Sequence, residues 1–376
     1  MAGLYIHFPF CKSKCIYCSF YSIATLSLKD DYIQALCNEL RLRKSFLNNQ
    51  SFDTIYFGGG TPSLFTPQEL EIIINAILKE LNINSEIEFT MELNPDGISL
   101  DDLSGYKSLG INRLSIGVQS FNNHILKLLR RRHNVDDIDD VIRNAVKVGF
   151  ENISIDLIYG ILERTTKEWK EEIIQAFSYP ITHLSAYSLT VEENTLLSKQ
   201  IRCGDRAVPS EEKAINDYLI LQTMLKSNDF QQYEISNYTK NNKISRHNNA
   251  YWQNIPYLGL GPSAHSYDLY ARYWNTSDIN LYINSVNSGK IPCEKEELSS
   301  DDQYNEFILL RLRTTAGIDL IEMQTRFGET MYNYFLKNLH KITNNHYIMD
   351  EKSVILTDQG RLFADYIAGE LFSCKK

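Results

Sequence analysis

Short apolar runs alternate with longer amphipathic stretches over the first half of the chain. The predicted strands are Leu4–Phe8, Thr54–Phe57, Ile87–Glu92, Arg113–Gly117, Ile153–Tyr159 and His183–Leu189. Apolar residues recur every three or four positions in the predicted helices Lys29–Phe46, Pro67–Leu81, Ile138–Val148 and Lys167–Phe177. This repeated strand-then-helix order predicts an α/β fold in which a parallel sheet with right-handed crossovers closes into a partial (β/α)6 barrel.

The alternation stops after residue 190. Residues 191–299 contain a predicted helix, Glu211–Lys226, and a tyrosine-rich strand, Tyr233–Tyr238, which we interpret as an extension of the barrel. The remaining predicted elements are helices near Asp302–Leu312, Leu320–Phe327 and Thr330–Leu339, two short strands, and a final helix Gln359–Leu371. Their order resembles a winged-helix α+β module. We therefore predict three parts: a barrel core (1–190), its extension (191–299) and a carboxyl-terminal module (300–376).

Composition and charge restrict the classes of partner. The 376 residues include 43% hydrophobic and 23% charged positions, which are ordinary values for a globular protein. The net charge of −9, with Arg130–Arg132 as the basic run, argues against a nucleic-acid binder. No apolar run is long enough for a membrane span, and residues 1–10 lack the features of a signal peptide. We expect a cytoplasmic protein, with peripheral membrane contact left open.

Three cysteines follow the first predicted strand at C-x3-C-x2-C spacing: Cys11, Cys15 and Cys18. Three thiolates can hold three corners of a [4Fe–4S] cluster and leave the fourth iron open for chemistry. The alternatives are a zinc knuckle completed by His7, whose usual spacing differs, and cysteines that are simply buried. The other cysteines are scattered and are interpreted as structural or surface residues: Cys37, Cys203, Cys293 and Cys374.

Polar and glycine residues collect where the predicted strands end. The turn Gly58-Gly59-Gly60-Thr61 follows the second strand, Glu92 ends the third, and Gln119 and Asp156 belong to the next two. In barrels of this kind the working groups sit at the carboxyl ends of the strands. Glycines permit a close backbone approach to a ligand, and a carboxylate suits a ribose hydroxyl or an ammonium group. Each residue alone is more often a turn or a cap, but their serial placement favours a shared site.

The cysteine spacing resembles that of the radical S-adenosylmethionine (SAM) superfamily, in which SAM chelates the open iron. The stretch Tyr5–Cys11 and the sequences GGGTPS, ELNP, GVQSF, DLIYG and AYSLTVEENT extend the resemblance to the coproporphyrinogen-oxidase-like radical SAM group over essentially the whole chain. This resemblance implies a [4Fe–4S] cluster and SAM. It places SAM against Tyr5, Tyr17, Gly59, Gly60, Thr61 and Glu92, and matches Gln119, Arg131 and Asp156 to a second SAM position in the oxidase.

Two branches of that group compete. The oxidase branch decarboxylates coproporphyrinogen III and carries a longer amino-terminal extension and a further cysteine, where this chain has Phe20. The segment Arg246–Trp252 instead matches the HNxxYW pattern of a haem-chaperone branch. That resemblance implies haem contacts by His247, Asn248, Tyr251 and Trp252.

Imidazole is a haem-iron ligand, and aromatic rings can pack on a porphyrin face. The alternative is that His247 hydrogen-bonds a backbone carbonyl while Tyr251 and Trp252 fill a core. His265 offers a second histidine. The leading expectation is a protein that carries haem to acceptor proteins, with respiratory proteins among the candidates. The alternatives are an oxygen-independent coproporphyrinogen oxidase and a radical haem methyltransferase. The sequence indicates no oligomeric state.

Overall fold

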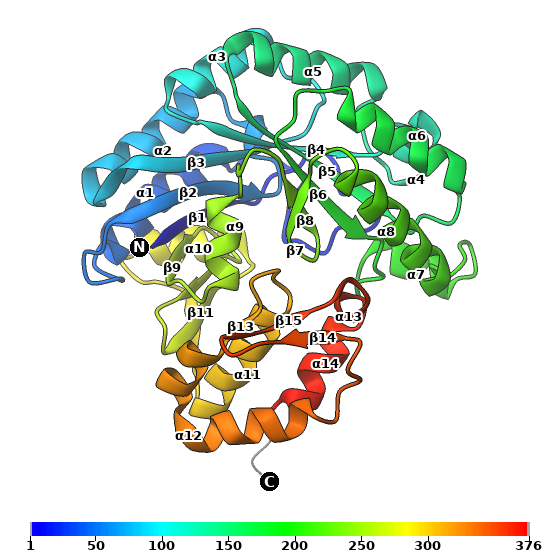
Figure 1. Ribbon diagram of the computed structural model, residues 1–376. Coiled ribbons are helices and arrows are strands. Elements are labelled where there is room, and N and C mark those ends of the chain that lie inside the picture. The colour runs from blue at the N-terminus through cyan, green and yellow to red at the C-terminus, as the bar shows by residue number, and fades with distance from the viewer. Residues whose placement is uncertain (1, 374–376) are drawn as a thin grey trace.

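The computed structural model describes residues 2–373, so Cys374 lies outside the described residues. The six predicted strands are present and lie in chain order as parallel neighbours (Figure 1). They are β1 (Gly3–Phe8), β2 (Phe52–Gly59), β3 (Ile83–Leu93), β4 (Arg113–Gln119), β5 (Asn152–Tyr159) and β6 (His183–Ser188). The helices that follow them are α1 (Lys29–Arg43), α2 (Pro67–Glu80), α3 (Leu100–Ser108), α4 (Asn123–Leu128), α5 (Val135–Val148) and α6 (Thr166–Phe177). The predicted α/β fold class is confirmed.

Alternation along the strands separates the core from the lumen of the barrel. In β1, Leu4, Ile6 and Phe8 are fully buried in the main hydrophobic core. Tyr5 and His7 lie on the other face of the strand, because successive side chains point to opposite sides. The outer helices begin at side-chain caps, such as Thr66 before α2, which accepts a hydrogen bond from the Glu69 backbone N–H. Polar side chains of the lumen therefore point toward one another.

The extension contributes six further strands to a 12-stranded sheet, of which the sequence predicted only the β7–β8 region. β9 (Tyr257–Leu260) pairs in parallel with β1, and β10 (His265–Tyr267), β11 (Ala271–Asn275) and β12 (Cys293–Glu297) follow it. On the other edge, the run predicted as one strand over Tyr233–Tyr238 is a hairpin of β7 (Gln231–Glu234) and β8 (Asn237–Thr239). The helices here are α7 (Leu196–Arg202), α8 (Glu211–Lys226), α9 (Arg246–Trp252) and α10 (Ile279–Asn287).

The carboxyl-terminal module has its own hydrophobic core and a small antiparallel sheet. Its elements are α11 (Ser300–Leu312), β13 (Ile318–Asp319), α12 (Leu320–Leu339), β14 (Tyr347–Met349), β15 (Ser353–Leu356), α13 (Asp358–Arg361) and α14 (Ala364–Leu371). Gly328, with φ 77°, interrupts α12 where two helices were predicted. The division of the chain at residues 190 and 299 stays a prediction.

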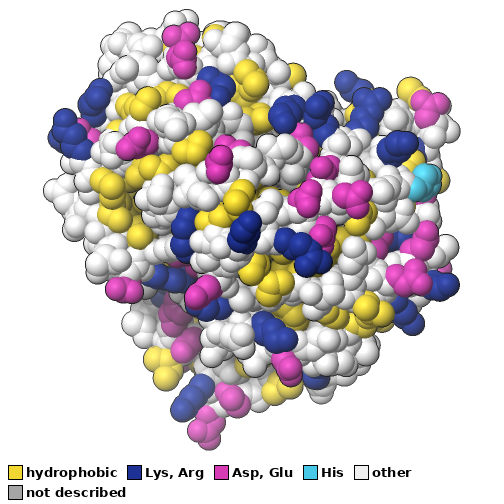
Figure 2. Space-filling view, turned by 90° about the horizontal axis from the view of Figure 1, so that it is seen from above, with side chains coloured by type: hydrophobic (Ala, Val, Ile, Leu, Met, Phe, Trp, Pro, Cys, Tyr) yellow, Lys and Arg dark blue, Asp and Glu magenta, His cyan; other side chains and the backbone are white. Residues whose placement is uncertain are grey.

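The β7–β8 hairpin joins the module to the barrel. The Ile235 backbone N–H donates to the Arg313 carbonyl at 3.1 Å, and the Thr315 N–H donates to the Tyr233 carbonyl at 3.0 Å. An ion pair between Arg272 of β11 and Glu306 of α11 adds a second link. Over the outer helices, seen from above, positive and negative side chains are interspersed with apolar ones (Figure 2). Among residues 2–373, no helix has the length and apolarity needed to cross a bilayer.

Candidate functional site

The cysteine loop is anchored at both ends. The Cys11 backbone N–H donates to the Ile23 carbonyl at 3.0 Å, and the Ile23 N–H returns a bond to Pro9 at 2.7 Å. The Ile16 side chain is buried in a small apolar cluster, which holds the middle of the loop. These contacts place the three thiols, which are all partly exposed, beyond the carboxyl end of β1.

Hydrogen-bond donors from other parts of the chain reach the thiols. Arg131 Nη1 lies 3.4 Å from Cys15 Sγ, and Thr61 Oγ1 lies 3.6 Å from Cys11 Sγ. Burial, with smaller contributions from the other two thiols, raises the pKa of Cys18. Among residues 2–373 no three His, Cys, Asp or Glu side chains gather closely enough to hold a single metal ion. Separate thiolates with donors beside them fit a cluster, in which each cysteine binds its own iron.

A chain of side-chain hydrogen bonds connects this loop to the ends of β2, β3 and β4. Arg131 Nη2 donates to Asn94 Oδ1 at 2.5 Å and to the Gly117 carbonyl at 2.7 Å. Asn94 Nδ2 in turn donates to Thr61 Oγ1 at 2.8 Å. Asn94 was not predicted as a site residue, although its place directly after β3, beside Glu92, was the available signal.

The phenol of Tyr17, predicted to lie against SAM, is buried next to the charged guanidinium of Arg131. Burial raises the pKa of the Tyr17 phenol. Burial works against the charge of Arg131, yet Tyr17 and Cys15 raise the pKa of this guanidinium above its ordinary value. Arg131 Nε has no hydrogen-bond partner among the described residues. This buried donor is available to an anionic group bound beside the cysteines.

Glu92 and the glycine turn form one unit. Glu92 accepts hydrogen bonds from the Tyr56 hydroxyl at 2.8 Å and from the Gly59 backbone N–H at 3.1 Å. Burial raises the pKa of Glu92 to about 7. Gly59 has φ 102°, and a Cβ there would lie 2.5 Å from His7 Nδ1. A Cβ on Gly60 would lie 2.6 Å from the Phe8 and Phe10 carbonyl oxygens, so these glycines are required by the protein's own packing.

Gln119 and Asp156 lie farther along the same rim. Gln119 has φ 69°, a strained value for a residue with a side chain, and the pairing of β4 with β5 shifts just before it. Asp156 accepts a hydrogen bond from Ser115 Oγ at 3.3 Å, and burial raises its pKa to about 6. Arg113 was not predicted as a site residue. Its side chain is 1% exposed, and its Nε and Nη1 have no hydrogen-bond partner among residues 2–373.

Tyr5 lies inside the barrel, beside His7, Tyr56 and His247. Its hydroxyl is 3.1 Å from His7 Nδ1. Its ring stacks at 6.1 Å from Tyr56 and at 6.4 Å from His247, measured between centroids. Tyr5 therefore connects the Glu92 end of the lumen with the HNxxYW segment.

That segment forms α9, and its histidine points into the barrel. His247 is 2% exposed, and burial lowers its pKa to about 3. Nδ1 lies 2.8 Å from Thr54 Oγ1, and Nε2 lies 2.9 Å from the Tyr251 hydroxyl. Since Thr54 and Gly3 belong to the amino ends of β2 and β1, His247 closes the end of the barrel opposite the cysteines. Both ring nitrogens are engaged, by hydroxyls.

The other residues of α9 have different surroundings. The Arg313 guanidinium of the carboxyl-terminal module lies 5.6 Å from the Trp252 ring centroid. Trp252 Nε1 is buried and has no acceptor among the described residues. Asn248 is half-buried, and its backbone N–H donates to Ser245 Oγ at 3.4 Å. His265 is exposed and stacks on Trp274 at 6.2 Å. The residues predicted for haem are therefore divided between the barrel lumen and the module.

Comparison with known proteins identifies the family. The chain is 33% identical over 374 residues to the "Heme chaperone HemW" of Bacillus subtilis, covering 98% of each chain. The chain belongs to the HemW family. This HemW-family chain is also 37% identical over 325 residues to the "Heme chaperone HemW" of Synechocystis, covering 84% of this chain and 78% of that protein.

Domain and fold comparisons agree with this membership. Residues 5–174 match the radical SAM superfamily, and residues 298–363 match the HemN C-terminal domain. Coproporphyrinogen III oxidase (HemN) from Escherichia coli has the same fold, with a TM-score of 0.87 over 99% of this HemW-family chain and 90% of the oxidase. Identity to that oxidase is 22%, so the likeness concerns the fold alone. The predicted resemblance to the coproporphyrinogen-oxidase-like group and its haem-chaperone branch is confirmed.

Proposed function

We propose that this chain binds haem and passes it to acceptor proteins in the cytoplasm, with respiratory proteins among the candidate acceptors. The observation that carries this proposal is the HNxxYW segment in α9 of a chain that matches HemW of Bacillus subtilis from end to end. Phe20, where the oxidase pattern has a further cysteine, is 65% exposed beside the cysteine loop and points to the same function.

The radical SAM fold implies a [4Fe–4S] cluster and SAM. In this proposal Cys11, Cys15 and Cys18 hold the cluster, and Tyr17, Gly59, Gly60, Thr61 and Glu92 contribute to the SAM site. When bound, the pair can supply an electron and a 5′-deoxyadenosyl group. The protein's own part is binding and orientation: Thr61 and Arg131 hold the thiolates, and the Glu92 carboxylate can accept a proton or a hydrogen bond near neutral pH.

Tyr5 and the residues matched to a second SAM position have different places in the proposed site. Tyr5 lies deeper in the lumen, so its contribution to SAM is proposed through His7 and Tyr56. Gln119 of β4 and Asp156 of β5 lie on successive strands, and Arg131 follows α4. Gln119 Nε2 and Arg131 Nη2 meet beside Gly117, at 3.1 and 3.2 Å from a Cβ position there. These three residues are the proposed second SAM position.

The haem is proposed to contact the outer side of α9, where Trp252 lies. His247 can ligate iron only if its hydrogen bonds to Thr54 and Tyr251 break and α9 leaves the barrel, because both imidazole nitrogens are engaged. Ligation by His247 and contact by Asn248 stay predictions. Packing of the macrocycle against aromatic rings does not require that movement.

The test separates delivery from porphyrin chemistry. The protein, reconstituted anaerobically with iron and sulfide, is incubated with haem, or with coproporphyrinogen III plus SAM and a reductant. We expect a Soret band that persists through gel filtration and moves to an apo-haemoprotein on mixing, with no protoporphyrinogen formed. Sustained decarboxylation would favour the coproporphyrinogen oxidase. Failure to retain haem would refute the chaperone function.

A further inference from the structure

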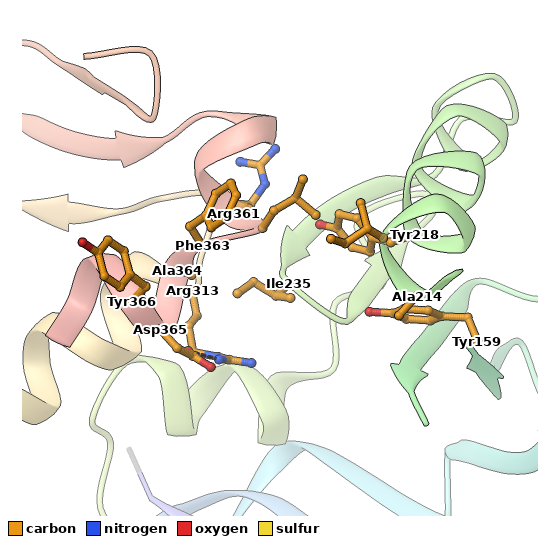
Figure 3. A pocket seen from close by; sticks show the side chains of 12 residues that line it. Tyr159, Ala214, Tyr218, Ile235, Arg313, Arg361, Phe363, Ala364, Asp365 and Tyr366 are labelled. Atoms are coloured by element: carbon orange, nitrogen blue, oxygen red, sulfur yellow. Dashed lines mark hydrogen bonds and ion pairs between the residues drawn. The ribbon is translucent and has the colours of Figure 1, made fainter. Parts of the chain in front are cut away.

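A groove separates the barrel from the carboxyl-terminal module. It runs between the end of β5 and α8 on the barrel side and the α13–α14 region of the module. It encloses a cavity of about 310 Å³. Figure 3 shows Tyr159 and Tyr218 on the barrel side, with their rings directed toward the module, and Arg361 and Phe363 on the module side. Ile235 lies between the two sides, and Arg313 lies at the base with Asp365. We call this site the module groove.

The lining of the module groove combines flat apolar surfaces with two guanidinium groups. Tyr218 is buried, whereas Phe363 is 44% exposed and extends the aromatic surface to the outside. A cavity of this size falls at the low end of ligand pockets, which span about 300–1,000 Å³. It can therefore enclose the edge of a large planar ligand while the rest lies against the exposed ring.

Both arginines pair with exposed acids that a ligand can replace, and Arg361 Nη1 also donates to the Leu356 carbonyl at 2.9 Å. Arg313 pairs with Asp365, whose side chain is 72% exposed, and Arg361 pairs with Asp358, whose side chain is 78% exposed. Ion pairs with such exposed carboxylates contribute little to stability. A guanidinium group offers several donors that match a carboxylate. Two arginines at one groove thus suit a ligand with two carboxylates.

Two buried donors in and beside the groove lack acceptors. Within residues 2–373, Arg361 Nε and Trp252 Nε1 are buried without a hydrogen-bond partner, although such groups are normally satisfied. Trp252 also stacks on Arg313, with the guanidinium 5.6 Å from the ring centroid. Arg313 therefore links the lining of the groove to Trp252 on α9.

We propose that the module groove is the docking site for the propionate edge of a porphyrin, with Arg313 and Arg361 binding the two carboxylates and Phe363 packing on the macrocycle. This inference rests on the proposed haem-binding function and gives that function a location. It requires no iron ligand from the groove, so metal-free porphyrin binds there as well. A half-open site of this kind allows the cargo to leave toward an acceptor.

The test uses the full-length protein, haem, mesoporphyrin IX and mesoporphyrin IX dimethyl ester, with affinities measured by absorbance and fluorescence titration. Each lost charge-assisted carboxylate contact should weaken binding about tenfold. Arg313→Gln should therefore weaken both haem and mesoporphyrin about tenfold. Phe363→Ser should weaken both by about the same factor, because the macrocycle loses an apolar packing partner. The diester loses both carboxylate contacts, so it should bind wild type about a hundredfold more weakly than the free acid.

Matched controls lie on distant surfaces. Arg143→Gln removes an exposed arginine that also pairs with one aspartate, Asp139, and Tyr270→Ser removes a ring that is 72% exposed. Both should retain wild-type affinity. The diester comparison uses wild type alone, so it holds even where a variant folds poorly.

The outcomes distinguish the two proposals. Wild-type haem binding that is unchanged in Arg313→Gln and Phe363→Ser, with equal affinity for acid and diester, overturns the module groove and leaves the chaperone function intact. A wild-type protein that binds neither haem nor mesoporphyrin overturns both.

Discussion

The buried position of His247 predicts a specific loss of stability in acid. His247 is 2% exposed, and its folded-state pKa is about 3 against an ordinary value of 6.5. Below pH 6.5 the unfolded chain binds a proton at this residue that the folded chain does not, so stability falls as the pH falls toward 3. Above pH 6.5 both states are neutral at His247, and the contribution is independent of pH.

The size of the effect follows from the difference between the two pKa values. At about 1.4 kcal/mol per pH unit, the full range corresponds to about 5 kcal/mol, and the part between pH 7.5 and pH 5 to about 2 kcal/mol. His247→Gln removes the titrating group. At pH 7.5 the variant should be less stable by about 3 kcal/mol, because the Thr54 and Tyr251 hydroxyls lose a buried partner and the ring leaves a void.

The measurement is urea unfolding of the metal-free protein at pH 7.5 and pH 5, followed by circular dichroism. The difference between wild type and His247→Gln should shrink by about 2 kcal/mol at the lower pH. Four other histidines also have lowered pKa values, and they affect both proteins equally and cancel: His7, His133, His183 and His265. The exposed His124 provides the control variant His124→Gln, which should leave the free energy of unfolding unchanged at both pH 7.5 and pH 5.

A difference between wild type and His247→Gln that is the same at both pH values would refute this reasoning. It would mean that His247 takes up a proton in the folded state, and hence that α9 opens readily. In that case iron ligation by His247 would become accessible without the cost of breaking two buried hydrogen bonds.

The cysteine loop and the glutamate end of the lumen give further predictions. Replacing Cys11, Cys15 and Cys18 together with alanine should abolish the brown absorption of the reconstituted protein, whereas Cys203→Ala, at an exposed residue, should preserve it; an iron content of about four per chain in the triple variant would contradict the assignment. Because burial brings the pKa of Glu92 to about 7, raising the pH from 6 to 8 should increase the carboxylate fraction and strengthen SAM binding in titration calorimetry. Glu92→Gln should bind SAM about tenfold more weakly and without this pH dependence, and an unchanged pH profile would place SAM elsewhere.

Local pattern was sufficient for the six parallel strands and for the helices α1, α2, α5 and α6, whereas the shorter helices α3 and α4 were not predicted. The helices and the six parallel strands have regular apolar periods, and β1 through β6 lie in chain order, so neighbours in sequence are neighbours in space. In the extension only the β7–β8 region was predicted, as one strand; β9 to β12 escaped prediction because they are short and β9 joins β1 across a long separation in the chain. β12 is exposed at all five positions and carries no apolar alternation that could reveal it.

The orientation of α9 shows what only tertiary structure decides. Helical geometry already places His247 and Tyr251 on one face and turns Trp252 about 140° away from His247. Both faces carry aromatic residues, so the sequence cannot say which of them meets the barrel. That choice depends on Thr54 and Glu88, which lie far away in the chain and bind the imidazole and the His247 backbone N–H. The module groove has the same origin, because Tyr218, Arg313 and Phe363 come together where the β7–β8 hairpin and the Arg272–Glu306 ion pair hold the module against the barrel.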